Sequence, residues 1–409
     1  MDSSQASLLP ECPKNVREME NRDREYCYTG PIIPVRGPCG AQFASHFAEP
    51  IGLDPMQGGG SPRQRVIGGL MISRRGPGGL WAFTCDACAM LAAAELNAAG
   101  GVLGRPVELV AADAGGSAAE SAAAARDLIE VEAVDAIVAR HPSDVRPAII
   151  AGIAGRVPYV YASMYEGGAH DAGVLPIGGT DAELLGHAIP LLMAQRRASR
   201  FFLLGNDRLW PRCTVGWASR IVAGNGGRVV GVDLLALGLE DYAPVFARIV
   251  RSRPDVVLTM FLGDESVRFN RAFAAAGLSA RLLRLEMGID ETILYGGGAD
   301  AHENLYVATT YVAGTASGGE AFAERYREGF GAGVPPATVF GRSCYDGVHL
   351  LARLAGAGRR PDAAALRRRF ARLSARHASG LVPRSVLTGA GQALLAEARG
   401  LELKVVAAH

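Results

Sequence analysis

The residues best placed for chemistry follow two short apolar runs. Residues 140–144, Arg-His-Pro-Ser-Asp, follow the run 136–139, and residues 161–167, Tyr-Ala-Ser-Met-Tyr-Glu-Gly, follow the run 157–160. Each run is typical of a buried parallel strand, and the first leads into a helical pattern. The hydroxyl of Ser143 is therefore expected at the carboxyl end of a strand, beside helix N–H groups that have no intrahelical acceptor. Small ligands bind at that edge of open α/β sheets, so this stretch predicts a binding site.

The rest of the chain alternates strand and helix patterns, as expected if it forms two lobes around that site. Strands are predicted at residues 66–72, 106–111, 136–139, 158–162, 200–204, 228–235, 255–261 and 304–311, with a short strand pair within 390–406. Helices are predicted at residues 81–97, 117–131, 144–155, 182–195, 242–252, 265–276, 319–330, 341–355 and 362–373, with one more before Gly224. Such alternation indicates parallel sheets covered by helices on both faces, and the length requires two of them.

Residues 1–65 differ from everything that follows them. They mix Pro, Gly, charged residues and three Cys without a helix or strand period, and residues 57–62, Gln-Gly-Gly-Gly-Ser-Pro, are typical of a linker. We expect this segment to be a disordered extension, with the folded body beginning at Val66.

Charge and hydropathy exclude several classes of partner. The chain has 42 Lys and Arg against 41 Asp and Glu, which gives no support for direct nucleic-acid binding. No run of about 18 apolar residues and no charged-then-apolar leader is visible, so no membrane insertion is expected. The predicted location is the cytoplasm, or the periplasm if the true start has been misassigned.

Several features invite a metal, redox, nucleotide or enzyme interpretation without supporting it. Cys85 and Cys88 form C-x-x-C, but no second pair follows at metal spacing, so packing thiols are favoured and no metal or cofactor is expected. The Gly-rich turn at 76–79 matches neither nucleotide-binding loop. The chain has no G-x-S-x-G or H-E-x-x-H motif, and His141, His170 and His187 form no recognisable set with an acid and a nucleophile. Three consecutive arginines at 367–369 could be a nucleic-acid patch, although a solvated helix face is favoured.

Several stretches in order resemble one family, the type I periplasmic-binding-protein fold, in its branch of urea and short-chain amide binders. Residues 97–106, Asn-Ala-Ala-Gly-Gly-Val-Leu-Gly-Arg-Pro, look like the end of that family's first helix and the strand after it. Residues 161–167 are similar to its Tyr-Pro-x-x-Tyr-Glu-Gly element. Residues 205–212 are similar to Gly-Ser-Asp-Tyr-x-x-Pro-Arg, and residues 254–264 resemble its fifth-strand motif. The similarity covers residues 66 to about 409.

The resemblance implies two α/β lobes joined by three hinge crossings, which close on one small polar ligand. Lobe 1 is expected to comprise residues 66–185 and 313–373, and lobe 2 residues 186–312 and 374–409. Members include cytoplasmic amide sensors that sequester a transcription antiterminator, and exported binding subunits of ABC transporters for urea or amino acids. The first kind is favoured here, with a regulator protein as partner; the alternative is a transporter subunit whose partner is a permease. A homo-oligomer stays open.

The same resemblance assigns three site residues in lobe 1. Ser143 falls where the family places a ligand-contacting serine, although as a plain N-cap it would serve stability only. Ser163 would add a second hydroxyl. Tyr161 would supply an aromatic wall and a phenol, the alternative being packing at the strand end. An amide or urea needs both donors and acceptors from a closed cleft, because an unpaired buried polar group costs roughly 1 to 3 kcal/mol.

Departures from the family pattern point toward an acid or a larger amide. Trp210 and Arg208 stand where amide binders carry tyrosines, and a guanidinium can pair with a carboxylate. His141 replaces an aromatic residue and is either a donor or a loop residue. A second set lies at or near strand ends expected to face the cleft from lobe 2 and the hinge, with Glu286 as an acceptor for NH2 groups: Phe261, Glu286 and Tyr311.

Overall fold

The computed structural model describes residues 65–167, 173–315, 319–357, 363–378 and 392–408, together with 382, 384 and 387. The predicted extension at 1–65 lies outside these residues except for Arg65, and so does His170. Both sheets described below belong to one compact unit.

The first sheet is parallel throughout and has the strand order β2-β1-β3-β4-β5. Its strands are β1 (Val66–Ile72), β2 (Val107–Asp113), β3 (Ala136–Arg140), β4 (Tyr159–Tyr161) and β5 (Val174–Pro176). Side chains alternate between its two faces, as the period of two requires. Leu70, Val138 and Val160 pack on one face, whereas Ile137 and Tyr159 pack on the other.

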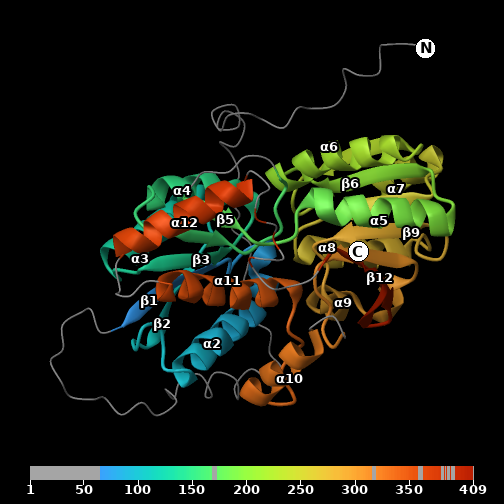
Figure 1. Cartoon of the computed structure of the whole chain (residues 1–409). Coiled ribbons are helices and arrows are strands. Elements are labelled where there is room, and N and C mark those ends of the chain that lie inside the picture. The colour runs from blue at the N-terminus through green and yellow to red at the C-terminus, as the bar shows by residue number, and fades with distance from the viewer. Residues whose placement is uncertain are drawn as a thin grey trace. The chain divides into compact units, whose positions relative to one another are not determined.

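Helices cover both faces of this sheet (Figure 1). The Leu70 face packs against α2 (Ala82–Ala98) and α11 (Val339–Gly356), and the Ile137 face packs against α3 (Ala118–Glu130) and α4 (Arg146–Ile153). Two 3-10 turns precede α2 and α4: η4 (Pro77–Trp81) and η5 (Ser143–Val145). We call this sheet and its helices lobe 1, together with α10 (Gly319–Phe330), which contacts α2, and α12 (Ala363–Ala378), which contacts β5 and α11.

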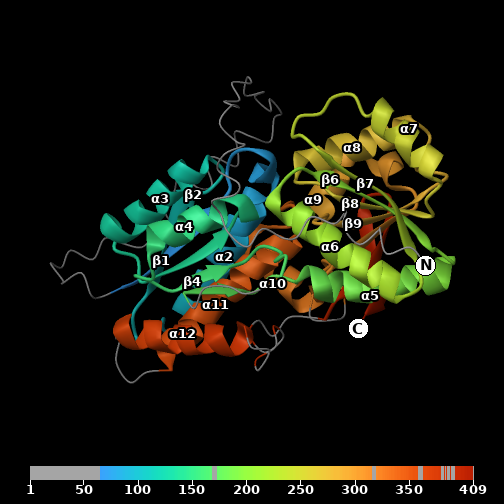
Figure 2. The same ribbon diagram turned by 90° about the horizontal axis from the view of Figure 1, so that it is seen from above.

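The second sheet has the order β12-β11-β10-β9-β8-β6-β7. Its parallel strands are β6 (Arg200–Asn206), β7 (Arg228–Leu235), β8 (Val256–Met260), β9 (Leu283–Met287) and β10 (Leu305–Thr309). An antiparallel pair, β11 (Leu394–Arg399) and β12 (Glu402–Ala408), extends it beyond β10. One face packs against α5 (Asp181–Arg196) and α6 (Leu209–Gly224), and the other against α7 (Ala243–Ser252) and α8 (Asp264–Ala275) (Figure 2). These elements, with α9 (Glu291–Gly297), form lobe 2.

The chain passes between the lobes three times. It leaves the first sheet after β5, returns after β10 to form α10, α11 and α12, and re-enters the second sheet at β11. Two helix-flanked parallel sheets joined by three crossings confirm the predicted fold class. Helix α5 begins at Asp181 and already packs against α6 and the second sheet.

One helical stretch, Pro77–Ala98, is long and apolar enough to cross a membrane by length and composition. Half of it is buried inside the protein, where α2 packs against α11 and the first sheet. Cys85 and Cys88 lie on its buried side and form no disulfide. The stretch is therefore the core helix of lobe 1.

Among the described residues, no group of three His, Cys, Asp or Glu side chains is placed to hold a metal ion.

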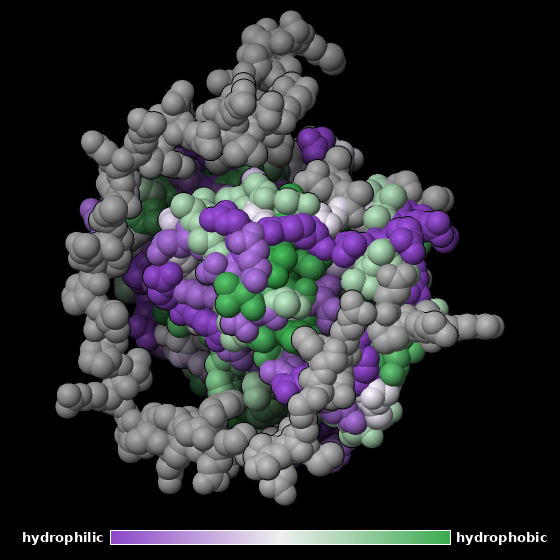
Figure 3. Space-filling view, turned by 90° about the vertical axis from the view of Figure 1, so that its left-hand side faces the viewer, coloured by the Kyte–Doolittle hydropathy of each residue, from purple (hydrophilic) through white to green (hydrophobic). Residues whose placement is uncertain are grey.

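Two of the three consecutive arginines of α12 lie on the outer side of that helix, and Arg369 is half-buried. Arg367 and Arg368 are exposed, while Leu366, Phe370 and Ser374 recur every four residues and are buried. This is the arrangement of a helix with one packed and one solvated face. A view onto the side of lobe 1 likewise shows hydrophilic and hydrophobic residues interspersed (Figure 3).

Candidate functional site

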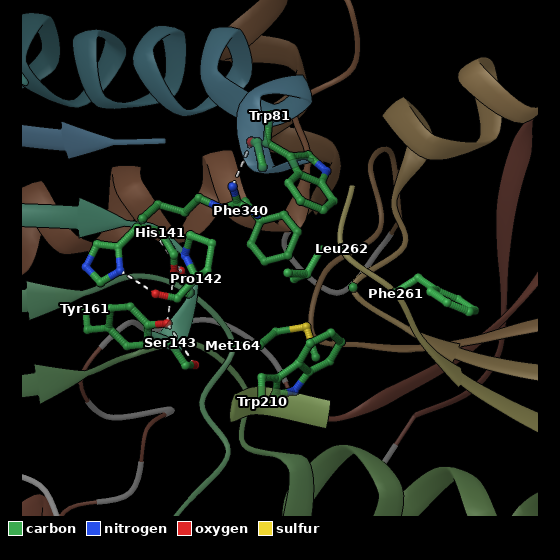
Figure 4. A pocket seen from close by; sticks show the side chains of 14 residues that line it. Trp81, His141, Pro142, Ser143, Tyr161, Met164, Trp210, Phe261, Leu262 and Phe340 are labelled. Carbon is green, nitrogen blue, oxygen red and sulfur yellow. Dashed lines mark hydrogen bonds between the residues drawn. The ribbon is translucent and has the colours of Figure 1, made fainter. Parts of the chain in front are cut away.

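A cavity lies between the lobes, and residues of both lobes line it (Figure 4). It encloses about 440 Å³ of empty space, part of which is open to solvent. Lobe 1 contributes Gly78, Trp81, Arg140, His141, Pro142, Ser143, Tyr161, Ser163, Met164 and Phe340. Lobe 2 contributes Trp210, Phe261, Leu262 and Gly288. The carboxyl ends of β3 and β4 in lobe 1, and of β8 and β9 in lobe 2, therefore face the cavity.

The hydroxyl of Ser143 lies in the cavity wall but already has a partner. Its Oγ donates to Oε2 of Glu166 at 2.9 Å and lies 3.4 Å from the Tyr161 hydroxyl oxygen. Glu166 is itself paired with Arg146, and both side chains are largely buried. The hydroxyl proton is therefore committed to a carboxylate, and the oxygen already accepts from Arg146 Nη1 at 3.3 Å.

Tyr161 and Ser163 are also bound within the wall. Both hydroxyls donate to the carbonyl oxygen of His141, each at 2.9 Å. The Ser163 oxygen additionally accepts the His141 backbone N–H at 3.1 Å. The two side chains thus provide hydrogen-bond partners for the main chain just after β3, where the pairing of this strand with its neighbours ends. They shape the cavity wall and do not present free donors to a ligand.

The imidazole of His141 points away from the cavity (Figure 4). Its Nδ1 lies 2.8 Å from the Pro142 carbonyl oxygen and its Nε2 lies 2.6 Å from the Tyr159 hydroxyl. A carbonyl can only accept, so Nδ1 carries the proton and Nε2 accepts from the tyrosine. Burial lowers the pKa of His141 to about 3, so the ring is neutral at neutral pH. His141 therefore contributes its main chain, and not its ring, to the cavity wall.

Trp210 forms the lobe 2 wall, and a buried carboxylate holds it in place. Its indole N–H donates to Asp181 at 3.1 Å, and the Thr214 hydroxyl donates to the other carboxyl oxygen at 2.5 Å. Asp181 is fully buried, and this burial raises the pKa of its carboxyl to about 7. The orientation of Trp210 therefore depends on a group that changes protonation near neutrality.

Replacing Asp181 with asparagine should change how stability depends on pH. The carboxyl in the unfolded chain has a pKa of about 4, so the folded state binds the proton more tightly and wild type loses stability as pH rises from about 4 to about 7. Asparagine does not titrate. The free energy of unfolding of Asp181→Asn, relative to wild type, should therefore increase across that window by on the order of a few kcal/mol. Urea unfolding at several pH values measures it, and a constant difference would contradict the assignment.

Phe261 contributes main chain to the wall, whereas its ring points into lobe 2 (Figure 4). The ring stacks on Phe269 of α8, with centroids 4.7 Å apart. Arg208 lies outside the lining residues, where its Nε donates to Asp144 at 2.9 Å. The guanidinium that the sequence placed near a ligand carboxylate thus pairs with a carboxylate of the protein.

Glu286 and Tyr311 also lie outside the lining residues. The Glu286 carboxylate is buried on β9 and accepts from Ser266 and Asn270 of α8, both at 3.2 Å. Burial raises its pKa. Tyr311 is buried against Phe322 of α10.

Arg140 lines the cavity and lies in the predicted stretch 140–144, although no binding role of its own was predicted for it. It ends β3, and its side chain is 5% exposed. The guanidinium carbon lies 4.1 Å from the ring centroid of Trp81 and 4.4 Å from that of Phe340. The sequence signal for Arg140 was a charged residue at the end of a run of buried apolar ones. The two rings around it come from η4 and α11, and no local sequence pattern relates these segments to β3.

Contacts beside the cavity join the lobes. Asp144 of η5 accepts from Arg208 Nε at 2.9 Å and from the Leu209 backbone N–H at 2.8 Å. These groups open α6, whose N-cap residue provides no side-chain acceptor of its own. The Trp217 indole N–H of α6 donates to the Glu166 carbonyl at 2.7 Å. A lobe 1 carboxylate therefore caps a lobe 2 helix.

Solved structures of two-lobed binding proteins resemble this chain over most of its length. A branched-chain amino acid transporter substrate-binding protein, LivJ from Streptococcus pneumoniae, solved with isoleucine, is 18% identical with a TM-score of 0.67, covering 84% of this chain and 99% of that one. A solute-binding protein of an ABC transporter from R. palustris, solved with benzoate, is 19% identical with a TM-score of 0.69, covering 84% and 96%. The leucine-binding protein LivK of Thermotoga maritima is 20% identical with a TM-score of 0.69, covering 84% and 98%.

At these identities the structures establish a common fold. The family itself follows from the sequence model of the periplasmic binding proteins, which matches residues 68–393 and so spans both lobes and all three crossings. The two-lobed fold, the cavity between the lobes and this match agree, and the chain belongs to the periplasmic binding protein family.

Proposed function

We propose that this protein is a non-catalytic binding protein that closes its two lobes on one small molecule. The observation that carries the proposal is the cavity whose walls come from lobe 1 and from lobe 2. A ligand that contacts both walls stabilises the arrangement in which the lobes meet, and it shifts the hinge equilibrium by its differential affinity for that arrangement. The contacts of Asp144 with the start of α6 would form in the same step.

The cavity supports an apolar or aromatic ligand body more than a very small polar one. The hydroxyl protons of Ser143, Tyr161 and Ser163 already have protein acceptors. Urea or acetamide would have to satisfy several polar groups in a cavity whose remaining walls include Trp81, Trp210 and other apolar side chains. These three hydroxyls therefore offer no free donor to support the urea and short-amide ligands that were predicted from the sequence.

The partner that we propose is an ABC permease, which would accept the ligand from the closed form. The support is the likeness to transporter binding proteins, since the names of LivJ and of the R. palustris protein place both in transport. A cytoplasmic amide sensor acting on an antiterminator-type regulator is the role that the sequence favoured, and it stays a prediction. Cell fractionation separates the two: a permease partner requires export, and a cytoplasmic regulator does not.

Ligand titration tests the binding function. The three tryptophans are Trp81 and Trp210, which line the cavity, and Trp217, which does not. We expect a compound from a panel of amino acids, carboxylic acids, amides and urea to alter tryptophan fluorescence and to raise Tm. At a hundredfold excess of ligand over Kd, binding adds about 2.7 kcal/mol to the free energy of unfolding. Trp210→Phe should lower the fluorescence response, because it removes an indole that lines the cavity. A panel without any response that depends on Trp210 would contradict ligand binding in this cavity.

A further inference from the structure

Arg140 is a buried cation without a counter-ion. Nη1 donates to the Gly78 carbonyl oxygen at 2.9 Å, and Nε is buried with no acceptor. Within the described parts of the chain, no carboxylate lies within ion-pair distance of its guanidinium. The carboxylate of Asp290 acts on its charge from outside the cavity lining, where it caps the start of α9 through the Thr292 N–H.

Other buried arginines of the chain have stronger partners. Arg146 is paired with the Glu166 carboxylate. Arg284 donates to the Asn270 side-chain oxygen and to the carbonyl oxygens of Ala301 and Glu303. An isolated buried charge is costly, and burial lowers the pKa of Arg140 accordingly. A bound anion would offset that cost, which the protein itself leaves uncompensated.

The lining around Arg140 defines the rest of the ligand. Among the residues that the structure describes, Arg140 is the only charged side chain that lines the cavity. Trp81 and Phe340 lie against its guanidinium, and Met164 and Trp210 add apolar surface to the wall. The described lining offers no carboxylate to an ammonium group, and one cation balances one negative charge. A guanidinium also matches the two oxygens of a carboxylate in geometry.

We propose that the cavity binds a small monocarboxylate with an apolar or aromatic body and no ammonium group, and that Arg140 binds its carboxylate. This inference rests on the binding function proposed above and specifies its ligand class. Trp81 and Phe340 hold the guanidinium between their rings, so that it stays in the wall, and Trp210 closes on the ligand body from lobe 2.

Two matched pairs of compounds test this with the full chain. Benzoate and benzamide have nearly the same shape and differ in charge; 4-methylpentanoate and leucine share a carbon skeleton and differ by the ammonium group. Affinity is measured by tryptophan fluorescence and Tm. We expect each acid to bind at least about tenfold more tightly than the other member of its pair. Benzamide leaves the buried guanidinium of Arg140 without an anionic partner, and leucine brings an ammonium group that has no partner in the described lining. Equal or tighter binding of leucine or benzamide would overturn the proposal.

Variants separate a binding role of Arg140 from a structural one. Arg140→Gln should lower the affinity for the acids about 30-fold or more and abolish their preference over the neutral amide. Arg140→Lys should retain part of it, because the charge remains. The ligand-free Tm of Arg140→Gln should be unchanged or higher, since an unpaired buried charge is removed. Arg200→Gln is the matched control, as Arg200 donates to the carbonyls of Ser252 and Arg253 at the start of β6. It should keep the acid preference.

The outcomes also distinguish this inference from the proposed function. Binding of amides or amino acids with a Trp210-dependent response, but not of acids, would leave the binding function in place and overturn the carboxylate assignment. An unchanged acid preference in Arg140→Gln would do the same. If none of the four compounds binds, the carboxylate assignment is contradicted, and the binding function is then decided by the wider panel of amino acids, carboxylic acids, amides and urea described above.

Discussion

The substitution Gly263→Ala is expected to weaken ligand binding strongly while each lobe stays folded. Gly263 lies between β8 and α8 in lobe 2, and Pro77 begins η4 in lobe 1. A Cβ atom added at Gly263 would lie 1.6 Å from the Pro77 carbonyl oxygen. No rotamer change relieves a clash between Cβ and backbone, so the lobes could not approach as they do here.

The size of the effect follows from the cost of separating the lobes. Overpacking alone costs about 1 to 3 kcal/mol, which corresponds to roughly a 5- to 150-fold loss of affinity if the contact forms only with ligand bound. The residue also has φ +47°, where alanine is strained, so a smaller loss of stability in the ligand-free protein is expected as well. Titration of the best ligand measures the first quantity, and thermal unfolding without ligand measures the second.

A matched glycine provides the control. Gly186 lies in helix α5, and a Cβ atom there would meet nothing within 4 Å. Gly186→Ala should leave affinity unchanged and raise stability by about 0.5 to 1 kcal/mol, because alanine is the better helix former. Wild-type affinity in Gly263→Ala would show that the ligand-bound protein does not use the contact between Gly263 and Pro77.

Periodicity predicted the architecture because the two sheets consist mostly of buried parallel strands. Residues 66–72 were predicted as a strand and form β1 with the same bounds, and helix 182–195 differs from α5 by one residue at each end. Strand β5 was not predicted, since its three residues, Val-Leu-Pro, are too few to show a period. On β9 the buried polar side chains Arg284 and Glu286 alternate with apolar ones, a pattern typical of a strand with one solvated face.

The candidate site was predictable only in part. The stretches 140–144 and 161–163 were selected because strand ends and hydroxyls are local features, and residues 140–143 with Tyr161 and Ser163 line the cavity. Whether a side chain at a strand end points into the cavity or into a lobe cannot be told from the neighbouring sequence alone. Met260 and Phe261 are neighbours, yet Met260 packs against one face of the second sheet and Phe261 against the other. The rings that enclose Arg140 come from segments far apart in sequence, so their meeting depends on the tertiary fold.

The substitution with the largest expected effect on stability is Arg146→Ala. Arg146 and Glu166 form an ion pair with side chains 12% and 6% exposed, and a second contact between Nη1 and Oε2 measures 3.3 Å. The guanidinium also lies 4.9 Å from the ring centroid of Tyr161 and 5.1 Å from that of Tyr165. Among the described residues, removing it leaves a buried carboxylate with the Ser143 hydroxyl as its one side-chain donor.

We expect Arg146→Ala to lose about 3 to 5 kcal/mol of stability, as found when one partner of a buried pair is removed. The measurement is urea unfolding, with Arg399→Ala as control. Arg399 and Glu397 form a surface pair with side chains 58% and 25% exposed, for which a loss of about 0 to 1 kcal/mol is expected. Equal losses in the two variants would show that the buried pair is screened like the surface one.

The double variant Arg146→Ala with Glu166→Ala distinguishes the value of the pair from the penalty of an orphaned charge. If the penalty dominates, adding Glu166→Ala to Arg146→Ala should recover stability, because the uncompensated carboxylate is then gone. The recovery should be incomplete, since Ser143 loses its acceptor and the rings of Tyr161 and Tyr165 lose a packing partner. Strictly additive losses would mean that the two side chains stabilise this wall of the cavity independently, through packing and not through their charges.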